Sequence, residues 1–88
     1  METAEDFFQQ GYEFVEQGDF VAAIASYDRA IEIKPDYDTA WYNRGSALDD
    51  LGRNEEAIAS FNKALEIKPD YYPASDNRDN VLRKLGRL

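Results

Sequence analysis

The chain has 88 residues, enough for one small domain, and its hydrophobic content of 43% and aromatic content of 14% fit a folded protein. It contains no cysteine and no histidine, which excludes disulfides, Cys/His zinc sites and histidine acid–base catalysis. Its net charge of −8 argues against nucleic acid and anionic membranes as partners.

The first predicted helix covers residues 4–16, where Phe7 and Phe14 belong to an apolar series with helical spacing. Gly18 suits the left-handed backbone conformation that often follows a helix, and Asp19 can cap the helix that comes next. A tight turn between two helices is therefore expected at this point.

The second predicted helix runs over residues 20–33. Its apolar residues recur at steps of three and four positions, as Phe20, Ile24, Tyr27 and Ile31. Pro35 prevents the helix from continuing, and Asp36 is expected to cap the helix that follows.

The chain repeats itself with a period of 34 residues, because residues 38–71 match residues 4–37. Both units end on the motif AIAS-x-x-x-A-x-EIKPDY. A fixed period of this length, made of two amphipathic halves, is typical of helical repeat arrays, so each unit is predicted to be helix–turn–helix. In the second unit Gly52 repeats Gly18, and Asn54 is expected to cap the second helix.

Gly11 and Gly45 occupy equivalent positions inside helices, where glycine costs about 1 kcal/mol relative to alanine. We expect them to permit close approach of the neighbouring helix, which would present the small Ala23 or Ala57. Both glycines are thus predicted to serve packing and not catalysis.

Residues 72–88 begin a third unit and stop halfway through it. Ser75 stands where the first two units have an aromatic residue, and Asp79 stands where they have glycine. This polar face predicts a terminal capping helix of the kind that repeat arrays need for solubility. The chain is therefore predicted to form one domain, 1–88, made of repeat 4–37, repeat 38–71 and capping helix 72–88.

These features resemble the tetratricopeptide repeat family across residues 4–71, with a half-repeat to the end of the chain. The resemblance is carried by the aromatic, glycine, alanine and proline positions that both units share: Phe7, Trp41, Gly11, Gly45, Ala23, Ala57, Tyr27, Phe61, Ala30, Ala64, Pro35 and Pro69. Gln10 and Arg44 depart from the family, which often has leucine there, so the resemblance supports the local packing less strongly at these two positions and leaves the predicted fold unchanged.

The resemblance implies an all-α fold of five helices, in which antiparallel helix pairs stack as a short right-handed α-solenoid. It also implies a protein–protein interaction role through the concave face, which is lined by the first helix of each pair. On that basis the residues expected to bind a partner are Phe8, Tyr12, Glu16, Tyr42, Asn43, Ser46, Asp49, Asp50 and Asn77. Phe8, Tyr12 and Tyr42 would form an aromatic floor beside an acidic edge, although Phe8 could equally be buried against a neighbouring helix.

Some family members, the chaperone adaptors, hold an acidic C-terminal peptide with a clamp of lysines, an arginine and asparagines. Only Asn43 matches that clamp here, and its other places hold Phe8, Tyr12, Pro73 and Asn77. Because the cationic part of the clamp is missing, the face favours a peptide or helix with apolar and basic residues.

An alternative is a self-associating scaffold that forms a homo-oligomer. Residues 72–88 carry a net charge of +2, whereas residues 1–71 carry −10. In this second hypothesis the basic C-terminal helix docks on the acidic groove of another copy.

No catalytic residue, metal site or cofactor is predicted. Asp36 is better explained as a helix cap and Asp49–Asp50 as a solvated helix end, since neither has calcium-loop spacing, and no phosphate-cradling glycine loop exists. The first residues lack the basic start and apolar run of a signal peptide, and no apolar run approaches transmembrane length. The expectation is a soluble cytoplasmic protein that is not an enzyme and does not bind membranes.

Overall fold

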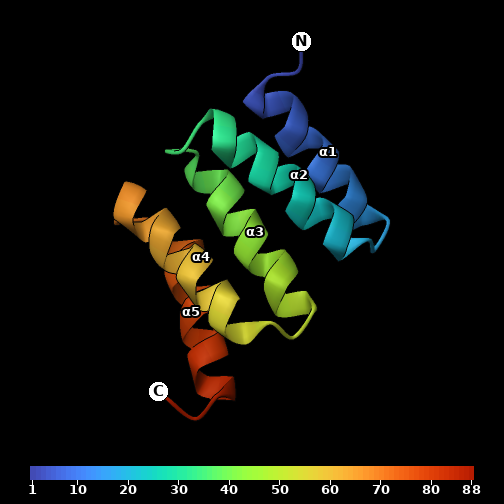
Figure 1. Cartoon of the computed structure of the whole chain (residues 1–88). Helices are drawn as coiled ribbons and strands as arrows, with labels where there is room; N and C mark the ends of the chain where they lie inside the picture. Colours follow the sequence, from blue (N-terminus) through green and yellow to red (C-terminus); the bar gives the residue numbers. More distant parts are fainter.

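A computed structural model describes all residues, 1–88, as five helices and no strands (Figure 1). The helices are α1 (Ala4–Glu16), α2 (Phe20–Ile33), α3 (Asp38–Asp50), α4 (Asn54–Ile67) and α5 (Tyr72–Lys84). Each helix packs mainly against its neighbours in the chain, while α1, α3 and α5 touch one another only slightly. The result is an elongated body of 43 × 27 × 16 Å with the two termini at opposite ends.

Side chains cap the first two helices. The Thr3 Oγ1 accepts a hydrogen bond of 3.1 Å from the Asp6 amide, and the Asp6 carboxylate accepts one of 2.9 Å from the Thr3 amide. This reciprocal pair satisfies two amides that have no partner inside the helix. Asp19 caps α2 as predicted, by accepting a bond of 3.1 Å from the Ala22 amide.

The other two predicted caps, Asp36 and Asn54, are wrong. The residues at the cap positions of α3 and α4 are Tyr37 and Arg53, and neither side chain makes a capping bond. Arg53 occupies the repeat position of Asp19, so Asn54 already lies inside the first turn of α4. The helix keeps its register from one unit to the next even where the capping side chain is lost.

Glycines end the first helix of each unit. Gly18 and Gly52 have φ values of +77°, and Gly86 has +73° after α5. Behind Gly18, the Asp19 amide donates to the Phe14 carbonyl at 2.9 Å, which closes the end of α1. The prediction of tight turns at these glycines is confirmed.

Gly11 and Gly45 do permit close approach, but not of the residues expected. A Cβ atom on Gly11 would lie 2.6 Å from the ring of Tyr27, and one on Gly45 would lie 2.7 Å from the ring of Phe61. The predicted close approach of the second helix is therefore confirmed, and the nearest atoms belong to an aromatic ring and not to Ala23 or Ala57. The aromatic residue one turn further along the second helix reaches back and covers the glycine.

Arg44, which stands where the family often has leucine, makes polar contacts with two neighbouring helices. Its guanidinium donates to the Asp28 carboxylate on α2 at 2.7 Å and to the Ser60 hydroxyl on α4 at 2.7 Å. It also lies 5.8 Å from the centre of the Trp41 ring. One polar side chain, 22% exposed, thus ties three helices together.

The first helices of the two units, α1 and α3, differ on the side with which α3 packs against α2. Ala40 and Ala47 of α3, which packs against α2, are buried. The equivalent positions on α1 hold Asp6 and Glu13, which are exposed. The outer side of α1 is therefore acidic where that of α3 is small and apolar.

Candidate functional site

Four of the predicted site residues meet at one hollow between α1 and α3. The hollow has a volume of about 110 Å³ and is lined by Tyr12, Val15, Tyr27, Asn43, Ser46, Ala47 and Asp50. Tyr12 comes from α1, whereas Asn43, Ser46 and Asp50 come from α3, which is the first helix of the next unit. We call this feature the α1–α3 hollow.

Phe8 does not line the α1–α3 hollow, and its ring packs against two tyrosines. The ring stacks on Tyr37 with centroids 5.2 Å apart and is tilted against Tyr27 at 5.7 Å. Burial raises the pKa of the Tyr37 phenol, and the charges of Glu5 and Asp38 raise it further. Phe8 is half-buried, and because Tyr37 lies between α2 and α3, this stacking helps to hold the turn between the two units.

Tyr42, the repeat equivalent of Phe8, is held in the same way. Its ring lies 5.9 Å from that of Phe61 and 5.3 Å from that of Tyr71, and its hydroxyl accepts a hydrogen bond of 2.9 Å from Asn77. Two of the predicted site residues, Tyr42 and Asn77, are thus bonded to each other across α3 and α5. Tyr12 differs from both rings, because 47% of its surface is exposed.

The polar groups of the α1–α3 hollow are only partly satisfied within the chain. The side-chain amide of Asn43 donates to the Tyr27 hydroxyl at the long distance of 3.5 Å. Burial raises the pKa of the Tyr27 phenol, and the bond from Asn43 offsets part of that rise. The side-chain carbonyl oxygen of Asn43 and the hydroxyl of Ser46 have no hydrogen-bond partner in the chain.

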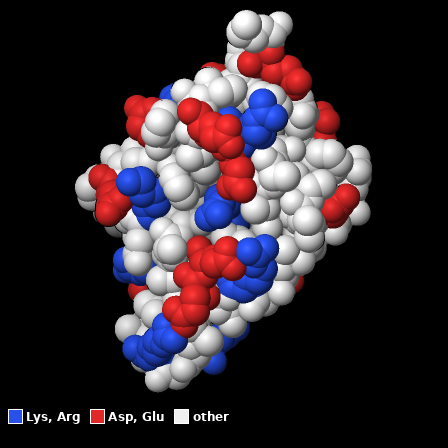
Figure 2. Space-filling model, viewed as in Figure 1, with Lys and Arg blue, Asp and Glu red and all other residues white.

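The predicted acidic edge is divided between a paired and an unpaired part. Asp49 forms an ion pair of 2.5 Å with Lys84 of α5, whereas Glu16 and Asp50 are in none of the seven ion pairs. Arg87 pairs with Glu55, and its hydrogen bond lowers the pKa of that carboxyl group. Figure 2 shows acidic and basic side chains side by side along the lower part of the visible face, near the C-terminus.

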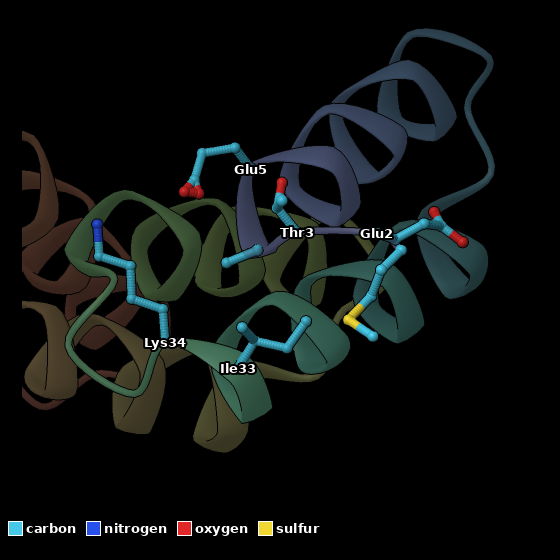
Figure 3. Close-up of a pocket in the computed structure, with 7 residues that line it drawn as sticks. Glu2, Thr3, Glu5, Ile33 and Lys34 are labelled. Atoms are coloured by element: carbon cyan, nitrogen blue, oxygen red, sulfur yellow. The ribbon is translucent and has the colours of Figure 1, made fainter.

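Two larger and more open hollows, each of about 410 Å³, lie where the end of a second helix meets the start of a first helix. In the first unit the lining residues are Met1, Glu2, Thr3, Ala4, Glu5, Ile33 and Lys34. Figure 3 shows this hollow between the start of α1 and the end of α2, with Glu5 and Lys34 toward one end of it and Glu2 toward the other. In the second unit the lining residues are Asp38, Thr39, Lys68, Asp70, Tyr71, Tyr72 and Pro73. Neither contains any of the predicted site residues.

No three residues among histidine, cysteine, aspartate and glutamate gather where they could hold a metal ion. None of the five helices combines the length and the apolar character needed to cross a bilayer.

Comparison with known sequences identifies the repeat. The sequence model of the tetratricopeptide repeat family matches residues 8–72. The uncharacterized protein MJ0572 of Methanocaldococcus jannaschii is 39% identical over 56 residues, which are 64% of this chain and 65% of that protein. The match therefore spans slightly less than two thirds of the archaeal relative.

Solved structures share the fold. A crystal structure of MamA superposes with a TM-score of 0.95 at 27% identity, over 97% of this chain and 50% of that chain. The TPR2B domain of yeast Sti1, in a complex described as TPR2B-domain:pHsp70, gives 0.90 at 29% identity, over 93% and 66%. The second TPR of Spaghetti (RPAP3), bound to the HSP90 peptide SRMEEVD, gives 0.95 at 25% identity, over 99% and 81%. The predicted α-solenoid of helix–turn–helix units is confirmed.

Proposed function

Because the chain belongs to the tetratricopeptide repeat family, we propose that it is a protein–protein interaction module that binds a peptide or helix on its concave face. The observation that carries this proposal is the α1–α3 hollow, where α1 and α3 bring together an exposed tyrosine, an amide, a hydroxyl and a carboxylate. A concave site with apolar walls and a few convergent polar groups is the usual form of a binding site. The similar second TPR of RPAP3 is bound to an HSP90 peptide, and the similar TPR2B domain of Sti1 is in a complex with pHsp70, which supports binding of a peptide segment.

The chemistry of the face supports a partner with apolar and basic residues. The peptide described with RPAP3, SRMEEVD, is acidic near its end. In this chain α1 carries no lysine or arginine, and Arg44 of α3 is already bound to Asp28 and Ser60. A peptide of that acidic kind would therefore find no free cation on these two helices. An apolar and basic peptide would meet Tyr12, Asn43 and Asp50 instead.

The proposal is tested with peptides selected from a random display library on the purified protein. Tyr12→Ala is expected to weaken binding of the selected peptides by about tenfold or more, which corresponds to about 1.4 kcal/mol. Tyr72→Ala is the matched control, because Tyr72 is 70% exposed and lies outside the α1–α3 hollow. Equal binding by the Tyr12→Ala protein and the wild-type protein would refute the concave-face proposal.

Self-association through the basic C-terminal helix remains the second proposal, and the difference in charge between residues 72–88 and 1–71 favours it. Within the chain, however, Lys84 is paired with Asp49, and Arg87 is paired with Glu55. Docking of this helix on another copy would have to exchange those pairs for new ones. Arg83 is in no ion pair and donates only to the Asn80 side chain at 3.0 Å, so its docking on another copy would break no ion pair.

A further inference from the structure

The N-terminal third of the chain carries negative charge that nothing in its own segment balances. Residues 1–28 contain seven aspartates and glutamates and no lysine or arginine. The four carboxylates on α1 are Glu5, Asp6, Glu13 and Glu16, and none of them is in an ion pair. A surface of one sign raises the local concentration of ligands of the opposite sign.

The α1–α3 hollow presents acceptors at its polar end. The Asp50 carboxylate, the Asn43 carbonyl oxygen and the Ser46 hydroxyl all lack a partner within the chain, and the donor amide of Asn43 is directed at Tyr27. A ligand that satisfies such a set must supply several N–H donors. Lysine offers three and arginine five, and neither side chain has an acceptor.

The remaining walls of the hollow suit the stem of the same side chain. They are formed by Tyr12, Val15, Tyr27 and Ala47. Long basic side chains lay their methylene groups along apolar surface while the charged end stays polar, and aromatic rings attract cations. At about 110 Å³ the hollow has about a quarter of the volume of either of the two other hollows, which suits the end of one side chain better than a peptide segment.

The chain itself shows what fills this place one unit further along. Between α3 and α5 the equivalents of Val15 and Asp50 are Asp49 and Lys84, and these two form an ion pair of 2.5 Å. No hollow is found there. In the α1–α3 hollow the equivalent positions hold Val15 and Asp50, so a carboxylate stands where Lys84 stands between α3 and α5. The α1–α3 hollow therefore contains an unpaired carboxylate and no cation.

We infer that the α1–α3 hollow is a subsite for one basic side chain of a bound partner, with Asp50 as its counter-ion and Asn43 and Ser46 as further acceptors. The inference rests on the proposed function, because it places one residue of the peptide that the concave face binds. The rest of that peptide would lie over the exposed ring of Tyr12.

The test uses defined probes on the full chain labelled with ¹⁵N. Nα-acetyl-lysine methylamide and its arginine counterpart are titrated, and the neutral norleucine compound of similar length serves as the control ligand. The two cationic probes are expected to shift the backbone amide signals of Tyr12, Asn43, Ser46 and Asp50, and norleucine is not. Asp50→Asn is expected to weaken the cationic probes by about three- to fivefold, whereas Asp36→Asn, an unpaired carboxylate elsewhere, changes binding by less than about 1.5-fold.

The result that overturns the inference is an equal response to lysine and norleucine, or a response spread over all acidic residues that Asp50→Asn does not alter. The library peptides separate this failure from failure of the proposed function. If peptides bind and depend on Tyr12, but exchange of their lysine or arginine for norleucine costs the same in wild type and Asp50→Asn, the subsite is wrong and the binding module stands. If no peptide binds while the cationic probes still localise to the hollow, the subsite stands without the module.

Discussion

Arg44 on α3 donates a hydrogen bond of 2.7 Å to the hydroxyl of Ser60 on α4, which is fully buried. The same guanidinium binds Asp28 on α2, so one side chain joins the second helix of one unit to both helices of the next. These two bonds satisfy the guanidinium of Arg44 at a position where the tetratricopeptide repeat family often has leucine. The energetic importance of the bond comes from the buried hydroxyl, which has no access to water.

Arg44→Ala is expected to lower the free energy of unfolding by about 2 kcal/mol, because it leaves the Ser60 hydroxyl buried without a partner. Lys63→Ala is the control, since Lys63 forms an exposed helical pair with Glu66, and it should cost less than about 0.5 kcal/mol. Urea unfolding followed by circular dichroism measures both. The double variant Arg44→Leu/Ser60→Ala should recover most of the loss, because it removes both polar partners together. A loss for Arg44→Ala as small as that for Lys63→Ala would contradict this assignment.

Gly45→Ala is expected to destabilise the protein by about 1–3 kcal/mol, although alanine is the better helix former by about 1 kcal/mol. The added methyl carbon would lie 2.7 Å from the ring of Phe61, which is fully buried. Thermal unfolding gives the comparison. Phe61→Leu in the Gly45→Ala background should restore part of the loss, and a Gly45→Ala protein more stable than wild type would show that the ring can yield.

The two tyrosines of the concave face are expected to differ in stability as well as in binding. Tyr42→Ala should cost about 2 kcal/mol or more, since the ring contacts Phe61 and Tyr71 and its hydroxyl accepts from Asn77. Tyr12→Ala should cost less than about 1 kcal/mol, because nearly half of that residue is exposed. Unfolding in urea tests both, and Tyr42→Phe separates the hydroxyl from the ring. Equal losses for the two alanine variants would show that Tyr12 packs as tightly as Tyr42.

The stability of the protein is expected to fall in alkali through Tyr27. Burial raises the pKa of this phenol above its ordinary value of 10.0 in the folded chain. The contribution of the Tyr27 phenol to the free energy of unfolding is fully present below pH 10.0. As the pH rises from there to the folded pKa, the unfolded chain has lost a proton that the folded chain retains. The free energy of unfolding then falls by about 1.4 kcal/mol per pH unit for this group.

Tyr27→Phe isolates that effect, because Phe61 already occupies the equivalent place in the second unit. The variant should match the wild type near neutral pH to within about 1 kcal/mol and should lose less stability in alkali. Urea unfolding between about pH 8 and pH 11 compares the two proteins. The pKa values of Tyr37 and Tyr71 are also raised by burial, so the decline of the variant should be reduced and not abolished. Parallel curves for the two proteins would contradict the assignment to Tyr27.

Light scattering is expected to give the mass of one chain, 10.1 kDa, at both low and high salt. The reason is that Lys84 and Arg87 are already engaged with Asp49 and Glu55. A dimer at low salt that dissociates at high salt would favour the scaffold instead, since screening weakens exposed charge pairs. Arg83→Glu/Lys84→Glu should then abolish the dimer.

Much of the fold could be predicted because the residues that end and begin the helices lie next to those helices in the sequence, and most of them occur in both repeats. Gly18 and Gly52 fix the turns through their own backbone conformation, and Asp19 caps from the residue next to the helix. The predicted caps Asp36 and Asn54 failed, because capping requires one specific residue before the helix, and the repeat register assigns that place to Tyr37 and Arg53.

Other features depend on contacts between units, which no single segment contains. The role of Arg44 requires Asp28 from the unit before it and Ser60 from its own second helix, each 16 positions away. The pairing of Asp49 with Lys84 spans 35 positions and divides an edge that looks uniformly acidic in the sequence. Tyr12, Asn43, Ser46 and Asp50 could be placed on one face because the resemblance to the tetratricopeptide repeat family implies which side of the first helices is concave, and the period carries that side from one first helix to the next.

The acidic outer side of α1 decides how an array of this design can grow. A unit fused ahead of α1 would press its second helix against Asp6 and Glu13, whereas Ala40 and Ala47 already fit a helix like α2. A tandem duplicate of residues 38–71 would find matching surfaces on both sides, and its arginine at position 44 would meet Asn62, as Arg78 does at 3.1 Å. Duplication of residues 38–71 would thus lengthen the array without placing another helix against the acidic side of α1.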